Sequence, residues 1–135
     1  MTKRESLSDL HILLVEDNKI NQMICEQFFL KLGCSVDLAE TGVDAIEKFK
    51  SEAHYDVIFM DCNMPEMDGF LATAAIRDIE KQAGLSPIPI VALTAHVEDS
   101  IRRQCLKAGM DMFLSKPFLF EDLEVIVSKI RTSIG

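Results

Sequence analysis

One stretch decides the fold of this chain: Val57-Ile58-Phe59-Met60-Asp61-Cys62-Asn63-Met64-Pro65-Glu66-Met67-Asp68-Gly69. Its first four residues are apolar, which is typical of a strand that is buried on both faces of a sheet. A carboxylate, Asp61, follows the strand directly, and a turn-rich segment comes next. Because ligands bind at the carboxyl ends of strands in open α/β sheets, we expect Asp61 to be the centre of a functional site.

Length and composition predict a single soluble domain. The chain has 135 residues, which favours one domain, and we assign residues 9–135 to it. Residues 1–8 are polar and are expected to form a flexible N-terminal segment or linker. Without a long apolar run or a signal-peptide pattern, we expect a cytoplasmic protein whose domain does not contact the membrane. The net charge of −8, with no basic stripe, argues against direct binding of nucleic acid.

The cysteines are expected to be structural. The chain has four of them, at positions 25, 34, 62 and 105, and no two have the CxxC spacing. Scattered thiols in a cytosolic chain are usually reduced and lie in or near the core. We therefore predict no disulfide and no cysteine-based metal site.

Strand and helix patterns alternate along the whole chain. Further strands are expected at residues 11–15, 35–39, 90–93 and 112–114. Asn18 and Thr41 are expected N-caps, and Gly33 and Gly109 are expected to end helices. Five strand–helix units with short connections predict a doubly wound parallel α/β sheet covered by helices on both faces. The second strand alternates polar and apolar residues, which fits an edge and hence the flavodoxin-like order 2-1-3-4-5.

Charged and polar residues follow four of these strands. Glu16 and Asp17 follow the first, Asp61 the third, Thr94 the fourth and Lys116 the fifth. In a parallel sheet they share one edge, where three carboxylates would repel each other unless a cation neutralised them. Oxygen ligands without His or Cys predict Mg²⁺ or Mn²⁺, and Mg²⁺ usually keeps positions for water and phosphate oxygens. The edge therefore suits a phosphoryl group.

This arrangement predicts phosphoryl transfer to a carboxylate. Asp61 can act as the nucleophile and form an aspartyl phosphate. Lys116 and the cation can stabilise charge on the transferring group, and Thr94 can hydrogen-bond one of its oxygens.

Four motifs, each at a strand end, resemble those of the response-regulator receiver domain, the phosphoacceptor module of two-component signalling. They are Leu14-Val15-Glu16-Asp17-Asn18, Phe59 to Gly69, Ala92-Leu93-Thr94-Ala95 and Ser115-Lys116-Pro117-Phe118. The resemblance covers about residues 9 to 133, and the four motifs in this order are very specific. It implies that a phosphohistidine on a partner is the phosphate donor.

The resemblance also implies roles for individual residues. Asp61 would be the phosphoacceptor, and Lys116 would contact the phosphoryl group. Asp17 and Asp61 would bind Mg²⁺ directly, together with the backbone carbonyl of Asn63. Glu16 would act on the metal through water.

Two further features are implied by the resemblance. Thr94 and Phe113 would occupy the hydroxyl and aromatic positions of a conformational switch. The peptide bond between Lys116 and Pro117 is expected to be cis.

The partner is predicted from the first helix. Glu16-Asp17-Asn18 followed by Asn21 resembles receiver domains of hybrid sensor histidine kinases, so the domain is either excised from such a kinase or a stand-alone regulator. We expect a histidine kinase or a histidine phosphotransfer domain to dock beside the Asp61 crevice. The expected docking residues are Asn18, Ile20, Asn21 and Ile24. Residues 28–30 are either core or part of this surface, and Ile20, Met23, Ile24 and Phe28 fall on one helical face.

Rival functions fit the sequence less well. A haloacid dehalogenase-type phosphatase would need a second Asp where Asn63 stands, and a flavodoxin would need a Ser/Thr-rich loop in place of the acidic pair. The chain has no GxxxxGK motif of a P-loop enzyme. The remaining alternative is a receiver-like protein-interaction scaffold that phosphorylation does not control. We expect no enzyme activity of the domain beyond its own phosphorylation and dephosphorylation.

Overall fold

The computed structural model describes residues 10–51, 55–62, 69–95 and 98–134, in which strands and helices alternate. The strands are β1 (His11–Val15), β2 (Ser35–Ala39), β3 (Val57–Asp61), β4 (Ile90–Thr94) and β5 (Met112–Ser115). The helices are α2 (Lys19–Lys31), α3 (Gly42–Ser51), α4 (Gly69–Ala83), α5 (Asp99–Ala108) and α6 (Phe120–Ile134). The predicted segment 1–8, and the boundary after it, lie outside the described residues.

The strands form one parallel sheet in the order β2-β1-β3-β4-β5, which confirms the predicted topology. β3 and β4 are buried along their whole length, whereas β2 at the edge is only partly buried. The alternating sequence of β2 therefore reflects its position at the edge. Because all strands run in the same direction, their carboxyl ends lie at one edge of the sheet.

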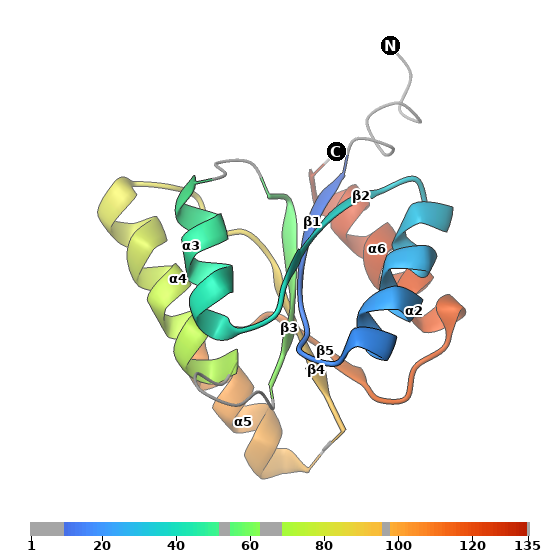
Figure 1. Cartoon of the computed structure of the whole chain (residues 1–135). Coiled ribbons are helices and arrows are strands. Elements are labelled where there is room, and N and C mark those ends of the chain that lie inside the picture. The colour runs from blue at the N-terminus through green and yellow to red at the C-terminus, as the bar shows by residue number, and fades with distance from the viewer. Residues whose placement is uncertain (1–9, 52–54, 63–68, 96–97, 135) are drawn as a thin grey trace.

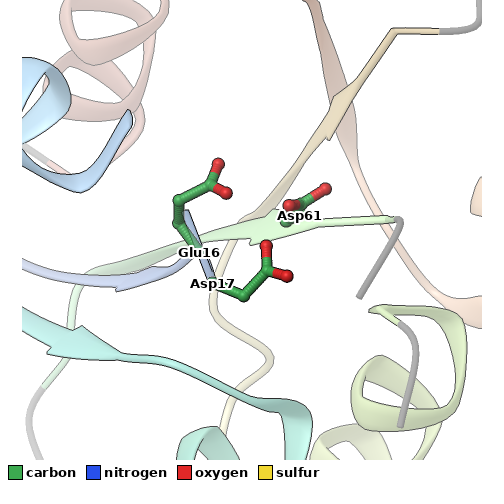
Figure 2. Close-up of side chains that lie close together, drawn as sticks. All are labelled: Glu16, Asp17 and Asp61. Atoms are coloured by element: carbon green, nitrogen blue, oxygen red, sulfur yellow. The ribbon is translucent and has the colours of Figure 1, made fainter. Parts of the chain in front are cut away.

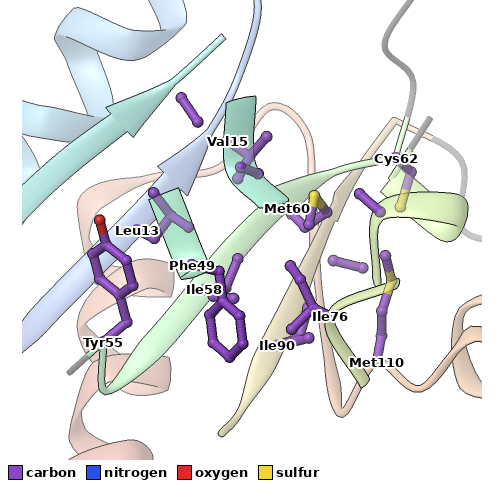
Figure 3. Close-up of a cluster of buried hydrophobic side chains, with 14 of the residues drawn as sticks. Leu13, Val15, Phe49, Tyr55, Ile58, Met60, Cys62, Ile76, Ile90 and Met110 are labelled. Atoms are coloured by element: carbon purple, nitrogen blue, oxygen red, sulfur yellow. The ribbon is translucent and has the colours of Figure 1, made fainter. Parts of the chain in front are cut away.

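Helices cover both faces of the sheet (Figure 1), with α2 and α6 on one face and α3, α4 and α5 on the other. Alternate residues of each strand point to opposite faces, so one strand feeds two cores. In β3, Ile58 and Met60 belong to the core under α3, α4 and α5 (Figure 3), and Val57 and Phe59 to the core under α2 and α6. The strands that end at the carboxyl-end edge are thus packed between two hydrophobic cores.

The ends of the helices follow the predicted capping residues. The side chains of Asn18 and Thr41 each accept a backbone N–H bond of 3.0 Å from the first turns of α2 and α3. Gly33 and Gly109 have φ angles of 81° and 108°, a left-handed conformation that glycine adopts without a Cβ penalty.

The inward face of α2 differs from the apolar face that the sequence suggested. Ile20, Met23 and Ile24 are 67%, 65% and 46% exposed. The buried residues of this helix are Gln22, Cys25 and Phe29. Of the stretch 28–30, Phe29 is core, Leu30 is exposed, and Phe28 packs edge-on against the Phe120 ring of α6 at 5.4 Å. The apolar stretch of α2 is thus divided between core and surface.

A guanidinium network, which we call the Arg77 network, joins α4 to the segments around it. The Arg77 guanidinium donates to the carbonyls of Gly109 and Ile88 at 3.0 and 2.9 Å. It also pairs with Glu80 at 2.7 Å and with Asp111 at 2.8 Å. Glu80 is only 3% exposed, so its charge depends on this partner.

Two expectations from composition concern the thiols and the membrane. The four cysteines are free and buried, as predicted. The Sγ atoms of Cys62 and Cys105 are 4.0 Å apart in the core. Burial raises the pKa of Cys25 to about 11, so its thiol is neutral at physiological pH. None of the helices in the described ranges is long and apolar enough to cross a membrane.

Candidate functional site

Two carboxylates of the site come from the loop between β1 and α2. The backbone N–H of Glu16 continues the strand ladder by donating to the Ala39 carbonyl at 3.0 Å. Its carboxylate Oε2 accepts the Asn18 N–H at 3.1 Å, and its carbonyl accepts the Gln22 side-chain N–H at 2.5 Å. Glu16 is therefore buried and held at three points, whereas Asp17, the next residue, is exposed.

The third carboxylate, Asp61, is the last residue of β3 and is 3% exposed. The next N–H, that of Cys62, donates to the Leu93 carbonyl at 3.0 Å and so continues the pairing with β4. Gly69, at the start of α4, passes so close that a Cβ there would lie 2.3 Å from the Asp61 carbonyl oxygen. Only glycine fits this approach without movement of the backbone.

The three carboxyl groups lie together at the carboxyl ends of β1 and β3 (Figure 2). One carboxylate oxygen from each of Glu16, Asp17 and Asp61 lies within 4.8 Å of the others. We call these residues the acidic triad. Two of the three are buried and only Asp17 is open to solvent. A ligand would therefore reach the triad from the Asp17 side.

Lys116 follows β5 and brings the compensating charge. Its ammonium lies 3.1 Å from Glu16 Oε1 and 3.3 Å from Asp61 Oδ2. Burial lowers the pKa of Lys116, but attraction by Asp61 and Glu16 outweighs burial and raises the pKa above its usual value. The backbone N–H of Lys116 donates to the Thr94 carbonyl at 2.8 Å, and its bond to Pro117 is cis, as predicted.

The charges of the site do not cancel. Three ionised carboxylates face one ammonium, which leaves a net charge of −2 in a partly buried space. A divalent cation would neutralise this charge, and oxygen atoms are the ligands that Mg²⁺ prefers. The donor set of the acidic triad therefore fits such an ion.

The two proposed switch residues lie on neighbouring strands. Thr94 is the last residue of β4 and is 2% exposed. Phe113 in β5 pairs with Ala92 and packs against the core under α3, α4 and α5. The Arg102 guanidinium of α5 lies 5.5 Å from the centre of the Phe113 ring, a cation–π contact. A movement of the Phe113 ring would therefore alter its contact with α5.

The structure brings most of the predicted site residues to one edge of the sheet. Glu16, Asp17 and Asp61 form the triad, with Lys116 in direct contact with two of them. The backbone carbonyl predicted as a metal ligand belongs to Asn63, which lies outside the described residues.

Sequence reasoning missed two supporting residues, Gln22 and Gly69. A signal for Gln22 was available, because it lies at helical spacing from Cys25 and Phe29, the buried positions of α2. For Gly69 the sequence indicated only a turn.

The fold and the acidic triad are those of a known class of protein, which comparison of the sequence with protein families identifies. The model of the response regulator receiver domain matches residues 12–128. The chain belongs to this family.

Its relatives include hybrid kinases and isolated receivers. Hybrid signal transduction histidine kinase B of Dictyostelium discoideum is 44% identical in an alignment of length 126 that covers 87% of this chain and 6% of that protein. The receiver of sensor histidine kinase PA1611 from Pseudomonas aeruginosa, solved with Mg²⁺ in its active-site cleft, is 39% identical with a TM-score of 0.82. That alignment covers 92% of this chain and 98% of that one.

A further neighbour was solved with its partner. The receiver of Ssk1 from Saccharomyces cerevisiae, co-crystallised with the histidine phosphotransfer protein Ypd1, is 34% identical with a TM-score of 0.88. That alignment covers 93% of this chain and 91% of that one. The kinase relative, by contrast, is many times longer than this chain.

Proposed function

We propose that this domain is the phosphoacceptor of a two-component phosphorelay and takes a phosphoryl group from a phosphohistidine onto Asp61. The observation that carries the proposal is the position of Asp61. It is a buried strand-end carboxylate that lies 3.3 Å from the Lys116 ammonium and within 4.8 Å of two further carboxylates. Membership of the receiver family supports the same function.

The chemistry follows from the residues around Asp61. A carboxylate oxygen of Asp61 attacks phosphorus, the bond between phosphorus and the histidine nitrogen breaks, and an aspartyl phosphate results. The Lys116 ammonium then attracts the phosphoryl oxygens, and the Thr94 hydroxyl can donate to one of them. Bound Mg²⁺ would supply positive charge next to the phosphoryl oxygens. Its proposed ligands are Asp17, Asp61 and the backbone carbonyl of Asn63, with Glu16 acting through water.

The test is phosphorylation by acetyl phosphate. Incubation of the protein with acetyl phosphate and Mg²⁺ should add one phosphate, measured by intact mass. Asp61→Asn should abolish the gain, whereas Asp78→Asn, at an exposed position on α4, should leave it unchanged. A phosphate on the Asp61→Asn protein would contradict the assignment, and no gain in the wild type would favour an interaction scaffold.

We also propose that phosphorylation biases a two-state element made of Thr94 and Phe113. The phosphoryl group would draw the Thr94 hydroxyl inward, and the Phe113 ring would fill the space that it leaves. Their neighbouring strands, β4 and β5, support this coupling. Structures with and without a beryllofluoride mimic of the phosphate decide the matter, because unchanged rotamers of both residues would refute it.

The proposed partner is a helical domain that bears a phosphohistidine, either a kinase dimerisation domain or a phosphotransfer protein. Its docking surface is the exposed face of α2, with Ile20 67% and Ile24 46% exposed and Asn18 at the start of the helix beside Glu16. An apolar patch beside a charged crevice suits a partner that binds through a helix face. The Ssk1 receiver, a structural neighbour, was crystallised with a phosphotransfer protein.

Transfer kinetics test the docking surface. A bulky charged residue in place of Ile20 or Asn21 should slow phosphate transfer from a labelled phosphotransfer protein. Labelling of Asp61 by acetyl phosphate should stay intact, since these side chains do not form the triad. If both reactions fall together, the substitution has damaged the fold or the site, and the docking proposal fails.

A further inference from the structure

Gln22 is a buried polar residue that takes no part in the proposed phosphoryl transfer. It lies on the first turns of α2 and is only 5% exposed. Its side-chain N–H donates to the Glu16 carbonyl at 2.5 Å. The side chain contacts the main chain of the loop between β1 and α2 rather than a carboxylate. Its effect on the site therefore has to pass through the backbone.

The carbonyl that Gln22 binds belongs to the peptide group between Glu16 and Asp17. Glu16 is fixed before this peptide by its N–H bond to Ala39, and the Asn18 N–H is fixed after it by the Glu16 carboxylate. The orientation of the peptide group between Glu16 and Asp17 sets the direction of the chain at Asp17, just after β1.

Asp17 depends on that orientation more than its neighbours do. Glu16 and Asp61 are buried and paired with Lys116, whereas the Asp17 side chain is exposed. Within the described ranges, no hydrogen bond or ion pair to the Asp17 carboxylate is formed. The loop backbone is therefore what keeps its carboxylate within 4.8 Å of Asp61.

We infer that Gln22 is a positioning residue for metal binding, acting through the Glu16–Asp17 peptide on the Asp17 carboxylate. The inference rests on the proposed function, because it assumes that Asp17 and Asp61 hold Mg²⁺. The competing explanation is that Gln22 only satisfies a buried carbonyl and contributes to stability alone. The two explanations differ in one measurable quantity, the affinity for Mg²⁺.

The experiment compares Gln22→Met with a matched control. Methionine keeps the length of the side chain and removes the N–H donor. The control is Tyr55→Phe, which also removes a side-chain hydrogen bond, the partly buried 2.7 Å bond to Asp37, and changes no residue of the acidic triad. The affinity for Mg²⁺ is measured from backbone amide shifts in NMR titrations, and stability by urea denaturation without metal.

We expect Gln22→Met to lower the affinity for Mg²⁺ about tenfold, the lower end of the effect of outer-shell partners on metal sites, because the Asp17 carboxylate is retained. Tyr55→Phe should lose stability and keep its Mg²⁺ affinity within about twofold. Phosphorylation of Gln22→Met by acetyl phosphate should be slow at low Mg²⁺ and recover at saturating Mg²⁺.

A second variant guards against a folding defect. Gln22→Asn keeps the amide group but shortens the side chain by one methylene. The N–H donor is then withdrawn from the Glu16 carbonyl with little change in polarity. It should show the same direction of change as Gln22→Met. If the folded variants bind Mg²⁺ as tightly as the wild type, Gln22 is structural only and the inference is overturned. If the wild type itself fails to bind Mg²⁺, the proposed function fails, and the inference with it.

Discussion

Replacing Asp17 with Asn should stabilise the metal-free protein. Asp17 has two like charges within 4.8 Å, those of Glu16 and Asp61. The ion pairs of the Lys116 ammonium are with those other two carboxylates, so the substitution breaks neither pair. The exposed position of Asp17 also means that the change disturbs no packing.

The magnitude follows from Coulomb's law. Two unit charges 4.8 Å apart repel by about 0.9 kcal/mol at the dielectric constant of water, which suits an exposed group. Two such pairs give about 1.7 kcal/mol, and the more distant attraction to Lys116 offsets part of it. We therefore expect the free energy of unfolding of Asp17→Asn to exceed that of the wild type by about 1 kcal/mol at low ionic strength.

Urea denaturation followed by circular dichroism measures this difference in buffer with a chelator. Added Mg²⁺ should reverse the order, because the wild type gains about 2.7 kcal/mol at a hundred times its dissociation constant. Asp17→Asn, which lacks a proposed ligand, should gain much less. The control Asp78→Asn should follow the wild type at every Mg²⁺ concentration.

A lower stability of Asp17→Asn than of the wild type in chelator, with Asp78→Asn unchanged, would refute the predicted repulsion. That result would mean that Asp17 makes a favourable contact that outweighs the repulsion. A stabilisation that persists unchanged in high salt would also refute it, since repulsion at an exposed site is screened.

Three further predictions concern the framework of the site. Gly69→Ala should lower the free energy of unfolding by about 1 to 3 kcal/mol in urea titrations, since the new Cβ would lie 2.3 Å from the Asp61 carbonyl oxygen, and an unchanged midpoint would contradict this. Arg77→Met should cost about 3 to 5 kcal/mol by leaving the buried Glu80 carboxylate without its cationic partner, and adding Glu80→Met should recover part of the loss. The pKa of Cys25 in the folded protein is about 11, above the ordinary value of 9.0 that the thiol has in the unfolded chain. The neutral thiol therefore contributes its whole share of the free energy of unfolding below pH 9, and this share is lost as the pH rises towards 11. Between pH 8.5 and about 11, the free energy of unfolding should therefore fall by about 1 to 3 kcal/mol more in the wild type than in Cys25→Ala. An equal fall in the two proteins would refute the raised pKa of Cys25.

Much of the architecture could be predicted because the decisive signals are local. Short apolar runs mark strands buried on both faces, and the alternating pattern of Ser35–Ala39 marks the edge strand. In a parallel sheet the residues at the carboxyl ends of the strands lie at one edge. The positions of Asp61 and Lys116 at this edge therefore follow from the predicted strand ends.

The details that depend on packing could not be predicted in this way. The apolar residues of α2 are more than one buried face of a helix can hold. Periodicity alone therefore does not indicate which face turns towards the sheet. In the structure Gln22 turns inward and donates to the Glu16 carbonyl, while Ile20 is exposed. The contacts of Lys116 with two carboxylates at once are likewise set by the distance between strands β1 and β3, which no sequence pattern specifies.

The Arg77 network gives α5 one fixed end. Gly109, which ends the helix, is tied through its carbonyl to α4, while the Asp99 end begins shortly after Thr94 and the site. A helix of 10 residues is about 15 Å long. A tilt of about 10° around Gly109 would move the Asp99 end by about 3 Å and leave the Gly109 end in place. Such a tilt would pivot at the contact between Gly109 and Arg77, at the opposite edge of the sheet from the acidic triad.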